Sequence, residues 1–277
     1  MNLIRIFIEL LFFLLDFISI IKVFFLICIL IIIFHIFAFS IRDKKYINAF
    51  NSYQDPEYVS INNLKEIPLV NVIIPAWNEG ETFKDCLLSI TKLRYPKIRV
   101  IVNAGGNDTT INIAECFKDN SNFILLRQSS GGKIKAINEC FNFIKEGIIY
   151  IVDADVYITD EILLRMILPI VNYNENVVIG HVRPLGSQEN KDLVKFLQID
   201  RNLYYRTKFT RYNLKIISGA NTTFKSNVIK AIEKFTDDRV YSVEVSQGND
   251  ILYKGFKIYS LTDYRGRIYS KRPNTIK

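Results

Sequence analysis

The chain has 277 residues, with 36 lysines and arginines against 28 acids and a formal net charge of +8. The basic residues are interspersed with acids and form no block interleaved with aromatic side chains, so we expect no nucleic acid partner. A location at a membrane surface accounts for the positive excess equally well.

The first 41 residues are mostly apolar and predict a membrane anchor. Residues 23–41 contain no Asp, Glu, Lys or Arg, and as a helix rising ~1.5 Å per residue they can cross the ~30 Å hydrocarbon core of a bilayer. Residues 6–21 are also apolar but carry Glu9 and Asp16 on one helix face, which indicates an interfacial or protein-packed segment before the span. A cleaved signal peptide is the alternative, but the apolar run is too long and no small-residue cleavage site follows it.

The charges that flank this span predict its orientation. Arg42, Lys44 and Lys45 follow it, whereas Arg5 and Lys22 precede it. Because Lys and Arg concentrate on the cytoplasmic side of a membrane span, we expect the rest of the chain to lie in the cytosol.

The remainder divides into a polar connector, residues 42–69, and a domain, residues 70–277, in which strand-like and helix-like segments alternate. This alternation predicts an α/β domain with a mostly parallel, Rossmann-like sheet that is covered by helices on both faces. Ligands bind such sheets at the carboxyl ends of the strands. The expected strands are residues 70–76, 98–104, 122–127 and 148–153, and the expected helices between them are residues 79–94, 108–118 and 132–146.

Two carboxylates stand where the fourth expected strand ends, in the run Ile149–Tyr157. A buried strand has no use for Asp153 and Asp155 unless something pairs with them. A turn that begins at Asp153 lets both reach one hard cation, which can also bind phosphate oxygens. The alternative is a plain strand end followed by the acidic start of a helix at Asp160.

Several short motifs follow one another along the domain. They are Pro75-Ala76-Trp77-Asn78-Glu79, Gly132-Lys133 with Ala136-Ile137-Asn138, Asp153-Ala154-Asp155, Val182-Arg183-Pro184 and Ser218-Gly219-Ala220-Asn221-Thr222-Thr223-Phe224. In this order, each near an expected strand end, they resemble the family 2 inverting glycosyltransferases of the GT-A fold, in particular the membrane-anchored members. The resemblance runs from about residue 70 to the end of the chain.

This resemblance implies a nucleotide-sugar donor and a lipid-linked or glycan acceptor at a membrane. It implies one Mg²⁺ or Mn²⁺ on Asp155, with Asp153 on the metal or on the donor ribose. Glu79 would contact the base or ribose, and Lys133 the phosphates or the base pocket; otherwise they are a first-turn helix acid and a solvated lysine. The residues expected to bind the nucleotide sugar are Pro75, Glu79, Asn103, Lys133 and Asp153.

The resemblance also implies a general base that deprotonates the acceptor hydroxyl, placed before a helix end that Lys254–Lys257 matches. Asp238 matches the family's motif in local sequence but lies too far upstream unless Ser246–Asn249 is an insertion. Glu244 has the expected separation from the helix end, and Asp250 is too close to it. We favour Asp238 and keep Glu244 and Asp250 as alternatives.

Two departures from the family pattern bear on function. The usual Asp-Asp-Gly-Ser after the second strand is replaced by Asn103-Ala104-Gly105-Gly106, so the resemblance does not identify the nucleotide. The chain stops at Arg272–Lys277, near the approach to the family's Gln-x-x-Arg-Trp helix, which fits a truncated chain or a short variant. Both departures favour the alternative of a non-catalytic GT-A-like membrane scaffold or binding protein, whereas Asp153, Asp155 and Lys133 favour an enzyme.

The flanking charges predict the result of protease treatment of sealed membrane vesicles. Residues 70–277 should be protected in right-side-out vesicles and digested in inside-out vesicles, because Arg42, Lys44 and Lys45 hold them on the cytosolic side. An immunoblot against a C-terminal epitope measures the protection. Digestion in right-side-out vesicles would show that these residues lie on the other side of the membrane, and it would not bear on the expected fold.

Overall fold

A computed structural model describes residues 2–51, 59–180, 182–184, 217, 219–237, 243–261 and 268–270. The chain divides into two compact units, Met1–Ala49 and Phe50–Lys277. The first unit is helical, and the second contains a mixed β-sheet with helices packed against it.

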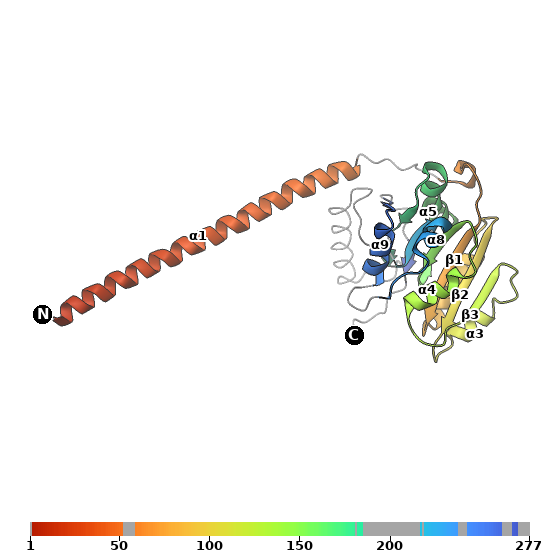
Figure 1. Ribbon diagram of the computed structural model, residues 1–277, viewed down its shortest axis with the longest axis horizontal. Helices are drawn as coiled ribbons and strands as arrows, with labels where there is room; N and C mark the ends of the chain where they lie inside the picture. Colours follow the sequence, from red (N-terminus) through yellow and green to blue (C-terminus); the bar gives the residue numbers. More distant parts are fainter. Residues whose placement is uncertain are drawn as a thin grey trace. The chain divides into compact units, whose positions relative to one another are not determined.

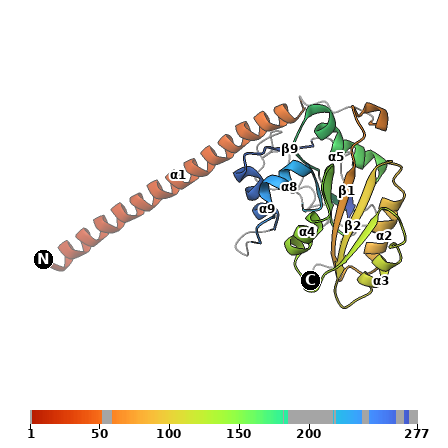
Figure 2. The same cartoon turned by 45° about the vertical axis from the view of Figure 1, so that its right-hand side comes forward.

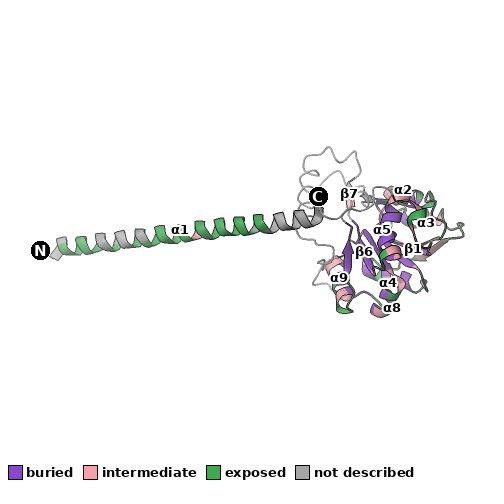
Figure 3. Cartoon of the chain, turned by 90° about the horizontal axis from the view of Figure 1, so that it is seen from above, coloured by how far each residue is buried: buried purple, intermediate pink, exposed green. Residues whose placement is uncertain are grey.

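The first unit is one long helix, α1 (Asn2–Asn51). Within the described residues, Ile20–Ala38 is the stretch that is long and apolar enough to cross a membrane. It overlaps the expected span, residues 23–41, and most of its side chains are exposed, as Figure 3 shows in green. Length and composition of this kind occur both in membrane spans and in signal sequences. The helix also continues through residues 42–51, which we expected in the connector.

The second unit is built on a seven-stranded sheet with the strand order β3-β2-β1-β4-β8-β6-β9. These strands are β1 (Val70–Trp77), β2 (Ile98–Gly105), β3 (Phe123–Arg127), β4 (Ile148–Val152), β6 (Val177–Ile179), β8 (Asn221–Lys225) and β9 (Ile258–Ser260). Figure 1 shows β1, β2 and β3 side by side. A smaller sheet joins β5 (Val156–Tyr157), β10 (Ile268–Ser270) and β7 (Val182–Pro184). The first four strands begin and end within one residue of the expected ones, which confirms that prediction.

Helices cover both faces of the sheet, as predicted (Figure 2). They are α2 (Glu81–Thr91), α3 (Thr110–Glu115), α4 (Lys133–Phe141), α5 (Asp160–Tyr173), α8 (Ser226–Ile232) and α9 (Val243–Tyr253), with the short 3₁₀ helix η1 (Ile61–Asn63) before β1. The helices α2, α3 and α5 bury apolar side chains such as Phe83 and Leu163 in one core cluster. The helices α4, α8 and α9 bury side chains such as Ile137 and Ile251 in a second cluster on the other face.

Strand direction decides which loops meet. Because β1 pairs in parallel with β2 and β4, and β2 with β3, the carboxyl ends of these four strands lie at one edge, the carboxyl edge. The strand β8 runs antiparallel to β4 with Asn221 opposite Val152, so the residues that precede β8 lie at the same edge. The pairing of β1 with β4 covers only Val70–Ile73. Pro75 has no N–H to donate and lies beyond the last of these pairs, where a missing ladder bond is tolerated.

Asp160 stabilises the start of α5. The Thr159 hydroxyl caps the first turn of α5 by accepting a backbone N–H at 3.3 Å. Asp160 lies in that first turn, where the helix dipole favours a negative charge, and accepts the Arg94 Nε–H at 3.0 Å. Asp160 therefore has the role of a helix-start acid that we considered as the alternative for this region. Asp153 and Asp155 lie before the helix, at the carboxyl edge.

Candidate active site

The loop after β1 is held at the carboxyl edge by hydrogen bonds to the loop after β2. The Glu79 N–H donates to the Thr110 hydroxyl at 2.8 Å, and the Gly80 N–H donates to Asp108 Oδ2 at 3.0 Å. These bonds fix the backbone position of Glu79. The motifs in the sequence did not identify Thr110 or Asp108 as its supports, because they lie outside the motif, at the start of α3 and in the loop before it.

Lys133 and Asp153 form an ion pair at the carboxyl edge. Lys133 is the first residue of α4 and follows Gly132, whose φ of 144° lies in the region that favours glycine. Asp153 directly follows β4, and Asp155 comes two residues later. About a third of each side chain in the pair stays exposed, 27% for Lys133 and 33% for Asp153. A ligand in solution can therefore reach both groups.

Glu79 belongs to the same electrostatic cluster. Burial, and then the negative charges of Asp155 and Asp153, raise the pKa of Glu79 to about 7, although the positive charge of Lys133 opposes the shift. A carboxyl group with this pKa is about half protonated at neutral pH. A cation placed beside Glu79 would therefore favour its ionised form.

Glu244 reaches this cluster from the first turn of α9. The Ile217 N–H donates to the Glu244 backbone oxygen at 3.3 Å, which ties α9 to the segment before β8. A Cβ atom built on Gly219 would lie 2.9 Å from Glu244 Oε1 and 2.9 Å from Lys133 Nζ. The ends of the Glu244 and Lys133 side chains therefore both border the space over Gly219, and the ion pair printed for Lys133 is the one with Asp153.

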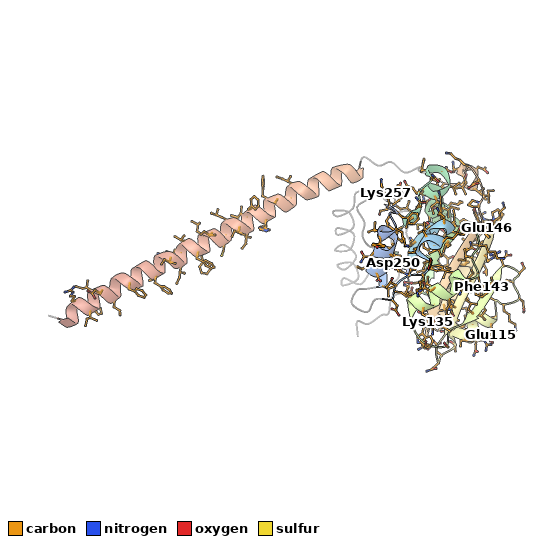
Figure 4. The ribbon with its side chains drawn as sticks, viewed as in Figure 1. Glu115, Lys135, Phe143, Glu146, Asp250 and Lys257 are labelled. Carbon is orange, nitrogen blue, oxygen red and sulfur yellow. The ribbon has the colours of Figure 1, made fainter. Side chains whose placement is uncertain are left out.

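Asp250, another candidate base, lies further along α9 (Figure 4). Its carboxylate accepts the Thr236 N–H at 2.7 Å and the Thr236 hydroxyl at 2.9 Å. The side chain of Asn138 on α4 binds Phe235, the residue before Thr236. It accepts the Phe235 N–H at 2.8 Å and donates to the Phe235 backbone oxygen at 2.9 Å. Asp250 and Asn138 thus clamp the chain that leads toward Asp238, which itself lies outside the described residues.

Two residues expected at the nucleotide, Pro75 and Asn103, are buried neighbours on β1 and β2. The Asn103 side-chain amide donates to the Ala136 backbone oxygen at 3.2 Å and to Glu139 Oε2 at 2.7 Å. Asn103 therefore holds α4, which carries Lys133, against the sheet. Neither Pro75 nor Asn103 is exposed at the carboxyl edge in this structure.

Trp77 ends β1 and keeps 36% of its surface exposed. Its ring lies against two glycines: a Cβ atom on Gly105 would lie 2.6 Å from Trp77 Cζ3, and one on Gly131 would lie 3.4 Å from Trp77 Cε2. Position 105 must therefore be glycine for the ring to take this place. In the sequence, Trp77 stands out only as part of a motif, and the motif does not predict the aromatic surface that it leaves at the carboxyl edge.

The sequence model described as Glycosyl transferase family 2 matches residues 71–233, which is more than half of the chain. The chain belongs to glycosyl transferase family 2. This confirms the family that the motifs predicted. The matched range contains Glu79, Lys133, Asp153 and Asp155, and it ends before Glu244.

Curated members of family 2 resemble the chain over part of their length. A poly-beta-1,6-N-acetyl-D-glucosamine synthase of Staphylococcus epidermidis is 27% identical over 184 residues, which are 64% of this chain and 44% of that protein. The probable glycosyltransferase YdaM of Bacillus subtilis is 25% identical over 188 residues, 63% of this chain and 44% of that protein. The chain thus spans less than half the length of these relatives.

Solved structures show the same fold. The mannosyltransferase PcManGT from Pyrobaculum calidifontis, in complex with GDP-Man and Mn²⁺, superposes with a TM-score of 0.65 at 19% identity over 85% of this chain and 66% of that one. Residues 1–349 of Staphylococcus aureus TarS, in complex with UDP-GlcNAc, give 0.59 at 17% identity over 75% and 60%. The GT-A fold predicted for this family 2 chain is therefore confirmed.

Asp153 and Asp155 of this family 2 chain fit a cation whose remaining coordination positions are filled by a substrate and by water. Among the residues that the structure describes, no group of three or more His, Cys, Asp or Glu side chains could enclose a metal ion. Mg²⁺ in phosphate-binding sites uses one or two carboxylates and completes its shell with water and substrate phosphates. Burial is the main cause of the raised pKa of Glu79, and the negative charges of Asp155 and Asp153 add to it, so these carboxylates lie close enough to interact.

The raised pKa of Glu79 predicts how the stability of the metal-free chain depends on pH. Because the pKa rises from 4.5 to about 7, the folded state holds the proton more tightly than the unfolded state. Protonation of Glu79 therefore adds to the free energy of unfolding. This contribution is complete below about pH 4.5 and is lost as the pH rises through 7. Glu79→Gln, which stays uncharged, should lose less stability than the wild type between about pH 5 and 8. Thermal unfolding of the full chain in detergent with EDTA measures this.

Glu81→Gln is the matched control, because Glu81 is an exposed acid two residues away at the start of α2. It should keep the pH dependence of the wild type. An identical pH dependence in Glu79→Gln and Glu81→Gln would contradict the electrostatic account of Glu79.

Proposed function

We propose that the chain is a membrane-anchored glycosyltransferase that moves a sugar from a nucleotide-sugar donor to a lipid-linked or polysaccharide acceptor, with inversion at the anomeric carbon. The observation that carries this proposal is the meeting of Lys133, Asp153 and Glu244 at the carboxyl edge of a family 2 domain. The names of the relatives, a polysaccharide synthase and a probable glycosyltransferase, support it.

On the donor side, the diphosphate must leave while its growing negative charge is compensated. Asp155 and Asp153 would hold one Mg²⁺ or Mn²⁺, which when bound neutralises that charge and orients the diphosphate. Lys133, whose ammonium already reaches Asp153, would pair with a phosphate oxygen. Glu79 would accept hydrogen bonds from the ribose or the base. The presence of Mn²⁺ with GDP-Man in the solved mannosyltransferase supports a divalent cation here.

On the acceptor side, inversion in a single displacement needs a base that takes the hydroxyl proton as the hydroxyl attacks the anomeric carbon. We propose Glu244, because its carboxylate approaches Lys133 from α9. Asp250 is less suited, since its two carboxylate oxygens already accept hydrogen bonds from Thr236. Asp238 is the alternative that the local sequence motif favours.

A non-catalytic scaffold is the competing function. Ala104, at a position where the family has an acid, supports it. The partly exposed pair of Lys133 and Asp153, beside the second acid Asp155, opposes it. A surface that only bound a partner would gain little from crowding these charges at one strand end, whereas a donor diphosphate requires them.

We further propose that α1 anchors the chain in a membrane and that the family 2 domain lies in the cytosol. The apolar stretch Ile20–Ala38 supports the anchor. The basic residues Arg42, Lys44 and Lys45, which follow the span that we expected from the sequence, support the orientation.

A bound donor should stabilise the chain, and the effect should depend on a divalent cation. At a hundredfold excess over Kd the gain is about 2.7 kcal/mol. Thermal unfolding with UDP-GlcNAc and with GDP-Man, each in Mn²⁺ or in EDTA, measures it. Asp155→Ala should remove the Mn²⁺-dependent part, whereas the control Asp119→Ala, at an exposed acid outside the site, should retain it. Equal stabilisation in Mn²⁺ and in EDTA would disprove the metal assignment.

The general base is tested by turnover of the three acid variants in membranes that contain the acceptor, measured as nucleoside diphosphate released. Glu244→Gln should lower the rate at least about 10²-fold, the low end for general base catalysis, while Asp238→Asn stays near the wild type. Asp250→Asn should act mainly through thermal stability, because it weakens the bonds to Thr236. An inactive Asp238→Asn with an active Glu244→Gln would assign the base to the sequence motif instead.

A further inference from the structure

The ammonium of Lys133 lies among acids that come from different parts of the fold. Asp153, at the end of β4, forms an ion pair with it. Glu244 approaches it from α9 across Gly219, because one point, the Cβ position of Gly219, is 2.9 Å from both Lys133 Nζ and Glu244 Oε1. Lys133 therefore faces an acid of the proposed donor site and the proposed base of the acceptor side at the same time.

The absence of a side chain at Gly219 permits this approach. The φ of Gly219 does not lie in the left-handed region, so the backbone alone does not require glycine there. A Cβ atom closer than 3.0 Å to another heavy atom has to displace it, and at Gly219 that atom belongs to Lys133 or to Glu244. The backbone of Glu244 is held by the hydrogen bond from Ile217, so a side chain at this position would separate the two charged groups.

We propose that Lys133 couples the donor diphosphate to Glu244. Before the donor binds, the ammonium of Lys133 pairs with Asp153 and also attracts the Glu244 carboxylate, which lies across Gly219 from it. A diphosphate at the donor site competes for the same ammonium, so its arrival releases Glu244 to accept the hydrogen bond of the acceptor hydroxyl. The inference rests on the proposed function, because it takes Lys133 to be a phosphate ligand. It gives the site an order, in which the acceptor is engaged after the donor.

Coupling of this kind is reciprocal. If the diphosphate draws Lys133 away from Glu244, then removing the charge of Glu244 must make Lys133 more available to the diphosphate. A base without contact to the donor site would leave the donor affinity unchanged. Because Lys133 and Asp153 are partly exposed and therefore screened by water, we expect an effect of about fivefold, at the low end of coupling between two sites.

The test is a double-mutant cycle on nucleotide binding, without any acceptor. Isothermal titration of the full chain in detergent, with UDP and with GDP in the presence of Mn²⁺, gives the Kd for the wild type, Glu244→Gln, Lys133→Met and the double variant. Glu244→Gln should bind the nucleotide about fivefold more tightly than the wild type. In the Lys133→Met background the same change should have no effect, because the shared cation is gone.

Glu146→Gln is the matched control, since it removes one negative charge from an exposed residue just before β4, at the opposite edge of the sheet (Figure 4). Tightening by Glu244→Gln no greater than by Glu146→Gln would overturn the inference. Failure of both nucleotides to bind the wild type would overturn the proposed function together with it. Binding that does not respond to Glu244→Gln would overturn the inference alone.

Gly219→Ala provides an independent measurement. Its methyl group should push Lys133 and Glu244 apart, so adding Glu244→Gln to Gly219→Ala should tighten nucleotide binding by much less than fivefold. Thermal unfolding of Gly219→Ala confirms that the variant is folded before titration. Full tightening in the Gly219→Ala background would show that the two charged groups do not meet over Gly219, and would overturn the inference.

Discussion

The parallel pairing of β1 with β2 and β4 is the constraint on which the functional side chains depend. It brings the carboxyl ends of these strands to one edge, where Glu79 and Asp153 lie although their strands are far apart in the chain. Apolar clusters on both faces of the sheet hold the strands in this register. The antiparallel strand β8 then adds Gly219 to the same edge, because it begins opposite the end of β4.

The charged groups at this edge are positioned by neutral side chains behind them. Asn103 binds α4 from the sheet, and Asn138 of α4 binds Phe235 in the chain after α8. Thr110, the first residue of α3, fixes the backbone of Glu79. Substitutions at these amides and hydroxyls would move the charges without changing any of them, so their effects on a reaction would be indirect.

The strands and the edge at which their carboxyl ends meet could be predicted from the sequence, because buried parallel strands are short apolar runs of the kind seen in β1 and β4. Asp153 could be placed at that edge for the same reason, whereas Lys133 was assigned to the donor site only through the family resemblance. The surroundings of Asn103 could not, since a strand residue has two faces and the sequence does not say which one α4 covers. The proximity of Glu244 to Lys133 depends on contacts between α4, α9 and Gly219 that no local pattern encodes.

The helix α1 has a consequence for the membrane in which the chain would lie. Its 50 residues amount to about 75 Å of helix at ~1.5 Å per residue, whereas the hydrocarbon core of a bilayer is ~30 Å thick. A straight helix placed upright would therefore carry exposed apolar residues such as Phe7, Leu10 and Phe13 out of the lipid and into water. If α1 spans a bilayer as proposed, it would therefore have to tilt steeply, to bend between Phe13 and Ile20, or to find a second apolar surface for its first turns.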